Sequence, residues 1–313
     1  MPTRAPSSIL MILGSCMSLQ LGAVLAIPLL AQFGAGLTTS ARLLISGLLL
    51  LALHRPRFFG WDRDTWKSVL LFGFAMAGMN GFFYAAIARI PLGIAVTIEF
   101  AGPLLLSAAL SRRRRDLGCV LAAATAIAVL GFGDHGGDGD RLDPVGVGYA
   151  LTAAAFWAFY IAAGKRVTTR MAGQGSLAIG ILVGAFVVAP FGVGSVGDLA
   201  SAAPAVLLPL VGMALLSSLI PYSLEFVAIR RLSPHVFGVL LCLEPVVACA
   251  AGWLLLDQAL SWVHGFAMLV VVVSAITVTL SQPAAPAAPP QPVGQVPAAS
   301  RNTCADGAST GSP

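Results

Sequence analysis

Apolar stretches of about 17 to 24 residues recur along the chain, separated by short polar segments. A helix of this length crosses the hydrocarbon core of a bilayer, which is roughly 30 Å thick. Only 10% of the 313 residues are charged, against roughly 25% in soluble proteins. We therefore predict an all-α polytopic membrane protein with ten transmembrane helices, at residues 9–30, 37–53, 68–88, 92–110, 117–132, 145–164, 177–193, 206–229, 235–255 and 261–280.

The basic residues predict an orientation for these helices. When the connecting segments are assigned alternately to the two sides, all but three of the 18 Lys and Arg residues lie on the side of the N-terminus. Cytoplasmic segments of membrane proteins carry such an excess. We predict a multi-pass protein of the inner (cytoplasmic) membrane with both termini in the cytoplasm. The run of arginines at 112–115 is then a topology anchor and not a patch for nucleic acid.

The sequence also contains a weak internal duplication. A shift of 142 residues places Ile87 on Ile229 and Pro103 on Pro245, so that the third and fourth helices match the eighth and ninth. Repeats of five helices enter the membrane in opposite directions, an arrangement found in secondary transporters. The predicted organisation is a cytoplasmic N-terminus at 1–8, a first five-helix repeat at 9–132, an external loop at 133–144, a second five-helix repeat at 145–280 and a disordered cytoplasmic tail at 281–313.

Four ionisable residues lie inside predicted helices: Arg42, Glu99, Glu225 and Glu244. Each costs roughly 2.5–3.5 kcal/mol at the centre of an inserted helix, so we expect them to face the bundle interior or a water-filled cavity. Glu99 and Glu244 lie midway along the two helices that the duplication makes equivalent, which predicts one shared central cavity. The alternatives are a snorkelling side chain or a structural ion pair for Arg42, a structural role for Glu225, and buried, protonated packing acids for Glu99 and Glu244.

Prolines and polar residues surround these charges. Pro103, Pro245 and Pro221 are expected to kink their helices at the site, because proline removes one backbone hydrogen bond. Pro103 frees the carbonyl of Glu99 in this way. A second set of residues is predicted either to line the cavity or to form hydrogen bonds between helices: Asn80, Tyr84 and Tyr222.

Nothing in the sequence indicates an enzyme. The motifs of zinc proteases, serine hydrolases and nucleotide-binding loops are missing from the chain. The four histidines and five cysteines are scattered, so we expect no metal and no cofactor. Without an element that binds ATP, a transporter of this kind would draw on an ion gradient.

Three strings carry a resemblance to a known family: 78–84 (GMNGFFY), 91–103 (PLGIAVTIEFAGP) and 221–225 (PYSLE), together with Glu244-Pro245. They resemble the bacterial threonine/homoserine exporters of the drug/metabolite transporter (EamA) superfamily, over roughly residues 9–280. The resemblance implies two EamA-type repeats and export of small amino acids, energised by protons. The long Pro/Ala-rich tail departs from the family pattern.

We therefore expect a secondary transporter that exports threonine- or homoserine-like amino acids by proton antiport and alternating access. In this hypothesis Glu99 or Glu244 binds the substrate ammonium or the coupling proton, and Arg42 favours the substrate carboxylate. Its partners are a zwitterionic amino acid, protons and membrane lipid, and its oligomeric state is open. The alternatives are export of another metabolite or a drug, and a membrane scaffold that transports nothing.

Overall fold

The fold is described by a computed structural model over residues 5–55, 60–111, 114–132, 142–170, 175–229, 232, 234–259 and 261–281. These residues belong to one compact unit, Met1–Gln282, and the second unit, Pro283–Pro313, lies outside the described ranges. The predicted tail at 281–313 is therefore undescribed except at Ser281, and the predicted external loop is undescribed except at residues 142–144.

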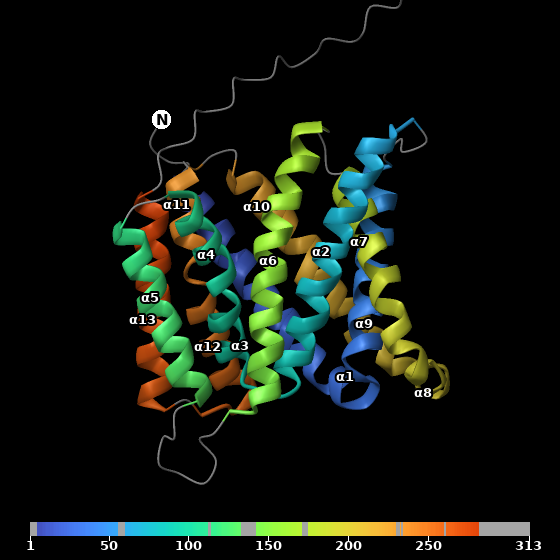
Figure 1. Ribbon diagram of the computed structural model, residues 1–313. Coiled ribbons are helices and arrows are strands. Elements are labelled where there is room, and N and C mark those ends of the chain that lie inside the picture. The colour runs from blue at the N-terminus through green and yellow to red at the C-terminus, as the bar shows by residue number, and fades with distance from the viewer. Residues whose placement is uncertain are drawn as a thin grey trace, which may run out of the picture. The chain divides into compact units, whose positions relative to one another are not determined.

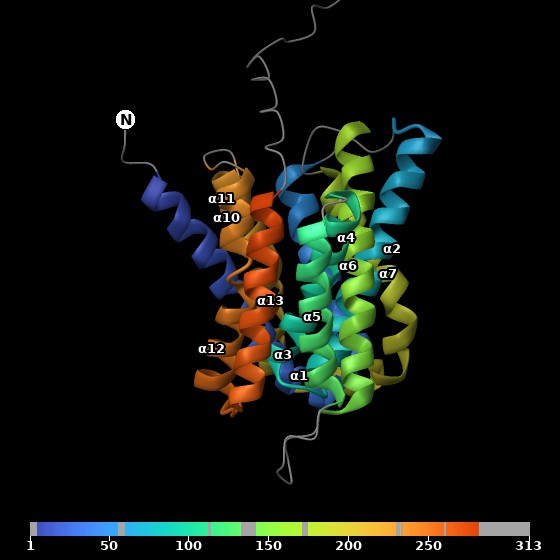
Figure 2. The ribbon, with the colours of Figure 1, turned by 60° about the vertical axis from the view of Figure 1, so that its left-hand side comes forward.

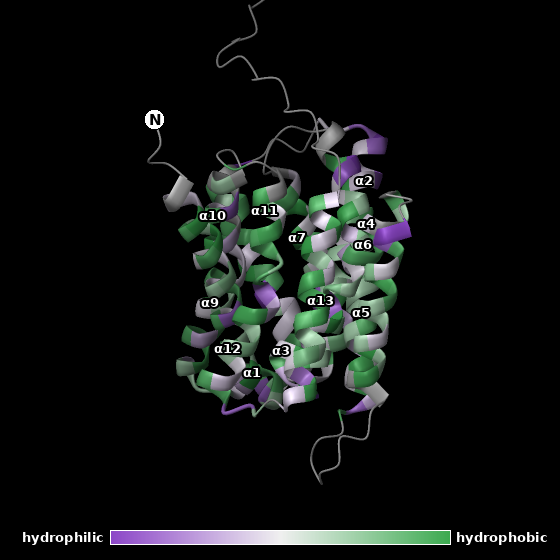
Figure 3. Ribbon diagram, turned by 90° about the vertical axis from the view of Figure 1, so that its left-hand side faces the viewer, coloured by the Kyte–Doolittle hydropathy of each residue, from purple (hydrophilic) through white to green (hydrophobic). Residues whose placement is uncertain are grey.

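Every regular element in the described part of the chain is helical (Figure 1). The elements are α1 (Ala5–His54), α2 (Arg63–Ile87), α3 (Leu92–Glu99), α4 (Ala101–Ser111), α5 (Arg114–Phe132), α6 (Pro144–Arg170), α7 (Gly175–Val188), η1 (Ala189–Ser195), α8 (Val196–Ser201), η2 (Pro204–Val206), α9 (Leu207–Ala214), η3 (Leu215–Leu219), α10 (Ile220–Ile229), α11 (Pro234–Leu241), α12 (Glu244–Leu256) and α13 (Trp262–Ser281). Seven helical stretches of the described residues are long and apolar enough to span a membrane, which confirms a polytopic all-α membrane protein. Figure 3 shows the apolar colouring along most of each helix.

One of these stretches, Ser7–Leu53, has 47 residues and is too long for a single crossing of a core roughly 30 Å thick. Its helical conformation is interrupted at Gly34, whose φ of 74° and ψ of 167° suit glycine because it has no Cβ. The interruption lies between the predicted helices at 9–30 and 37–53. The Thr38 hydroxyl donates to the Leu29 carbonyl at 3.2 Å across it.

Helix α1 packs against α7, α9, η3, α10 and α12, and therefore runs through the middle of the unit. α2 packs against α6 and α7, and α5 packs against α13 at the opposite edge of the view in Figure 1. Figure 2 shows α5 and α13 side by side. The start of α2, the end of α4 and the end of α6 lie at the same end of the bundle in Figure 1. Basic residues occur in these terminal segments, among them Arg63, Lys67, Lys165 and Arg166.

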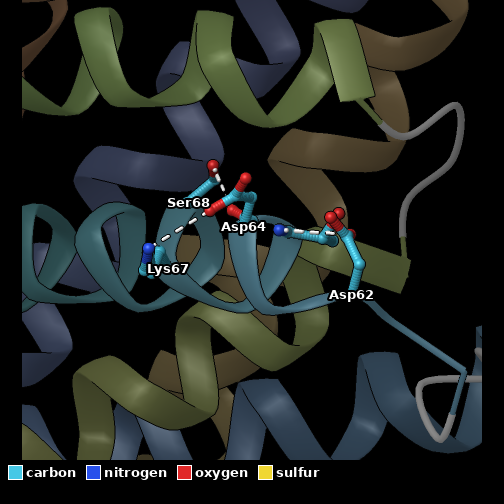
Figure 4. Close-up of polar contacts among 5 residues, drawn as sticks. Asp62, Asp64, Lys67 and Ser68 are labelled. Atoms are coloured by element: carbon cyan, nitrogen blue, oxygen red, sulfur yellow. Dashed lines mark hydrogen bonds and ion pairs between the residues drawn. The ribbon is translucent and has the colours of Figure 1, made fainter.

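The polar start of α2 is ordered by local contacts (Figure 4). The Asp62 carboxylate accepts from the Thr65 backbone N–H at 3.3 Å and so caps the helix. Lys67 forms a 3.2 Å ion pair with Asp64 one turn away. These charged residues precede the apolar part of α2 and fix where the helix begins.

Candidate functional site

Two helices of the bundle are broken in the middle, and a glutamate stands at each break. α3 ends at Glu99, and α4 begins at Ala101, two residues before Pro103. α11 ends at Leu241, and α12 begins with Glu244 and the buried Pro245. The prolines lack a backbone N–H and cannot continue the hydrogen-bond ladder of the preceding helix. Both interruptions are short, since the Phe100 N–H still donates to the Val96 carbonyl and the Cys242 N–H to the Gly238 carbonyl, each four residues back. They place the two glutamates at helix ends.

Glu99, Glu225 and Glu244 form what we call the carboxylate cluster. Glu244 lies within range of an electrostatic interaction with both Glu99 and Glu225. Glu225 accepts a 2.6 Å hydrogen bond from the Ser15 hydroxyl, and Glu244 accepts one from the Gln20 amide at 3.4 Å. Helix α1 therefore supplies the hydrogen-bond donors for two of the three acids.

No cation of the described residues pairs with these acids, since the ion pairs found there are Lys67–Asp64 and Arg89–Asp143. Glu99 is only 8% exposed, yet its carboxyl group makes no hydrogen bond and its oxygens are not fully enclosed. Burying several carboxylates without a counter-charge is costly. The cluster is therefore chemically suited to take up protons or a cationic group.

Arg42 lies in a separate polar cluster, 4% exposed. Its guanidinium donates to the Asn80 side-chain oxygen and, at 3.0 Å, to the Ser217 hydroxyl. It also lies over the Tyr84 ring, with Cζ 5.0 Å from the ring centroid. Ser217 belongs to η3, a short π-helical segment, and its backbone carbonyl accepts from Arg42 at 3.4 Å. We call the parts of α1 before and after Gly34 its first and second arm. The arginine thus joins the second arm of α1 to α2 and η3.

Comparison with known proteins identifies the family. The threonine/homoserine exporter RhtA of Salmonella typhimurium (strain LT2) is 35% identical over 277 residues, covering 87% of this chain and 91% of the relative. RhtA of Escherichia coli (strain K12) is 34% identical over 284 residues, 90% of this chain and 93% of the relative. The pattern of the EamA-like transporter family matches residues 144–280. The chain belongs to the EamA-like transporter family.

A solved crystal structure of a protein shares this fold, with a TM-score of 0.54 and 19% identity over 88% of this chain and 97% of that one. The suspected resemblance to bacterial exporters of the EamA superfamily is confirmed by the relatives. Because those relatives are transporters, the EamA-like protein is not an enzyme. It is a multi-pass membrane protein.

The structure divides the predicted site residues of this EamA-like protein into two groups. Glu99 and Glu244 stand at the helix breaks, with Glu225 of α10 within electrostatic range of Glu244, whereas Arg42 contacts Asn80 and Tyr84 of α2 and Ser217 of η3. Pro221 is buried at the start of α10, directly after η3, and the side chain of Tyr222 lies outside the described residues. The shared central cavity predicted for Glu99 and Glu244 stays a prediction, because these contacts do not test it.

Three residues of the two clusters were missed by reasoning from sequence: Ser15, Gln20 and Ser217. All three are buried polar residues within apolar helices, at 0%, 3% and 4% exposure. A search for charged residues inside helices passes over them, although a search for any polar residue there would have included them. The carboxylates therefore have neighbours on α1 that the charge pattern alone did not reveal.

A cavity of about 630 Å³ lies elsewhere, between α2, α6 and η1. Small and aromatic residues line it, including Gly78, Gly81, Phe82, Phe156 and Phe191. None of the predicted site residues belongs to its lining. Its apolar walls do not fit a zwitterionic amino acid.

Proposed function

We propose that this protein exports small hydroxylated amino acids of the threonine and homoserine type across the inner membrane, in exchange for protons. The names of its relatives suggest the substrate. The observation that carries the proposal is the carboxylate cluster, in which the half-buried Glu244 lies within electrostatic range of the buried Glu99 and the half-buried Glu225, and no cation of the described residues forms an ion pair with these acids. Such a group can hold either protons or a substrate ammonium.

Ten membrane-spanning helices in two inverted five-helix repeats, 9–132 and 145–280, are part of the proposal. The shift of 142 residues places α3, Leu92–Glu99, on α11, Pro234–Leu241, and the last residue of α2, Ile87, on the last residue of α10, Ile229. Elements with the same ends and the same central break in both halves support a duplication. The family match at 144–280 coincides with the second proposed repeat.

Alternating access accounts for a difference in helix packing between the two proposed repeats. α3 packs so closely on α12 that a Cβ on Gly93 would lie 2.7 Å from Cys249 Cα. A two-fold axis between the repeats would exchange this contact with one between α4 and α11, yet the described backbones of α4 and α11 do not pack closely. In the proposed orientation, with both termini cytoplasmic, the α3–α12 contact lies toward the outer side of the membrane and the α4–α11 pair toward the cytoplasm. This state is therefore closed on the outer side and less tightly packed on the cytoplasmic side.

The test is efflux of labelled threonine and homoserine from proteoliposomes, with and without an imposed proton gradient. We expect the gradient to stimulate efflux, and Glu244→Gln and Glu99→Gln each to reduce that stimulation at least tenfold. Asp198→Asn, which neutralises an exposed acid of α8, is the matched control and should transport normally. Gradient-driven efflux that survives both glutamine variants would refute the assigned role of the cluster, and no efflux from correctly inserted protein would refute the substrate.

A further inference from the structure

Gln20 has an unusual position for an amide inside an apolar helix. It is 3% exposed and lies on the first arm of α1, facing the break between α11 and α12. Its Nε2 donates to Glu244 at 3.4 Å. Its Oε1 is fully enclosed and has no hydrogen-bond partner.

A buried acceptor without a partner is unfavourable, because it has lost its water and gained nothing in exchange. Rotating the amide by 180° does not remove the problem, since one end of the amide faces Glu244 and the other end then remains unpaired. A hydrogen-bonding group that arrives in another state of the protein would satisfy that free end. Among described residues within α1 the neighbouring Ser18 cannot serve, because its hydroxyl already donates to the Leu216 carbonyl at 2.6 Å.

We infer that Gln20 is a specificity-determining residue whose free amide end hydrogen-bonds the side-chain hydroxyl of the transported amino acid. The inference rests on the proposed function, which places the substrate ammonium at the carboxylate cluster. In threonine the ammonium and hydroxyl are carried by adjacent carbons, and in homoserine by carbons one bond further apart. A small molecule held by its ammonium at Glu244 therefore brings its hydroxyl to the amide that contacts Glu244.

The chemistry also explains why Gln20 would discriminate between amino acids with and without a side-chain hydroxyl. A site built to pair with a hydroxyl rejects the analogue that lacks it, because the buried polar group is left unsatisfied. Access to the enclosed amide requires α12 to move relative to α1, and these helices pack against each other at Gln20 and Glu244. In the proposed mechanism, the substrate hydroxyl pairs with the free end of the amide on binding.

The test compares labelled threonine with labelled 2-aminobutyrate, which carries hydrogen in place of the hydroxyl, in one population of proteoliposomes. We expect the wild type to favour threonine by about tenfold, the effect of one buried hydrogen bond. Gln20→Met and Gln20→Leu should bring the ratio close to one. Ser18→Ala, on the same helix but with a hydroxyl that bonds the Leu216 carbonyl and not an acid of the cluster, should keep the wild-type ratio.

The ratio does not depend on how much protein is folded, because both substrates are measured in the same vesicles. A wild-type ratio retained in both Gln20 variants overturns the inference and leaves the proposed function standing. If the wild type exports threonine and 2-aminobutyrate equally, the inference is also overturned and the proposed function stands. If the wild type exports neither amino acid, both the inference and the proposed function are overturned. If a variant is inactive, its melting temperature in detergent is measured with threonine and with 2-aminobutyrate, and the difference between the two replaces the export ratio. A difference as large as in the wild type counts against the inference.

Discussion

The close contact between α3 and α12 can be tested by adding a single methyl group. Gly93 lies in α3, and a Cβ built on it would be 2.7 Å from Cys249 Cα and 3.0 Å from Cys249 N. These are backbone atoms, so no side chain can rotate out of the way. Gly93→Ala therefore forces the two helices apart by several tenths of an ångström.

The size of the effect follows from two opposing terms. Alanine favours a helix over glycine by about 1 kcal/mol. Overpacking a tight interior contact costs about 1–3 kcal/mol. The same substitution at Gly148 of α6, where a new Cβ would meet nothing within 4 Å, carries only the first term. Gly93→Ala should therefore be less stable than Gly148→Ala by about 1–3 kcal/mol.

The assay is thermal unfolding of the two variants and the wild type, purified in the same detergent and followed by circular dichroism. We expect Gly148→Ala to melt at or slightly above the wild-type temperature, and Gly93→Ala to melt several degrees below Gly148→Ala. Equal melting temperatures for the two variants would show that α3 and α12 are not in backbone contact at Gly93. The reasoning about the closed side of the protein would then be wrong.

Two further predictions concern the charged groups outside the carboxylate cluster. Arg42→Lys should lower the free energy of unfolding by about 1–3 kcal/mol in the same assay, because a compact ammonium does not reach the acceptors on α2 and η3 together as the planar guanidinium does, whereas the exposed Lys67→Arg should have no effect. The 2.8 Å hydrogen bond from Arg89 holds the pKa of Asp143 below its ordinary value of 3.8, so the pair stabilises the fold above that pH and the contribution is lost as the pH falls through the depressed pKa. The difference in melting temperature between wild type and Asp143→Asn should be constant from pH 8 to about pH 5 and disappear in strong acid, and a difference that grows on acidification would contradict this assignment.

The sequence predicted helix positions well wherever hydropathy determines them. The predicted stretch 261–280 corresponds to α13, Trp262–Ser281, and 68–88 falls in α2, Arg63–Ile87. Hydropathy does not register how a helix is interrupted, because apolar residues continue across the break. The predicted helix at 206–229 is therefore four elements in the structure, η2, α9, η3 and α10. The number of membrane crossings and the orientation of the termini remain predictions.

The site was predicted only as far as charge can predict it. Buried charge identified Arg42 and the three glutamates, because their cost inside a membrane demands an explanation. Charge does not say which of them are neighbours, and Arg42 turned out to be held by Asn80 and Ser217 instead of by a carboxylate. Which residues pair depends on how α1 packs between the two halves, and that packing involves uncharged side chains.

The packing of α1 also connects the carboxylate cluster with the polar cluster around Arg42. The first arm of α1 contacts the carboxylate cluster through Ser15 and Gln20, and the second arm carries Arg42. Both arms meet one continuous stretch, in which η3 provides Ser217 and α10 provides Glu225. A π-helical segment is rarer and less regular than an α-helix and is often found at functional sites. The partner of Ser15 and the acceptors of Arg42 therefore lie on one continuous stretch of chain, whose π-helical part contains Ser217.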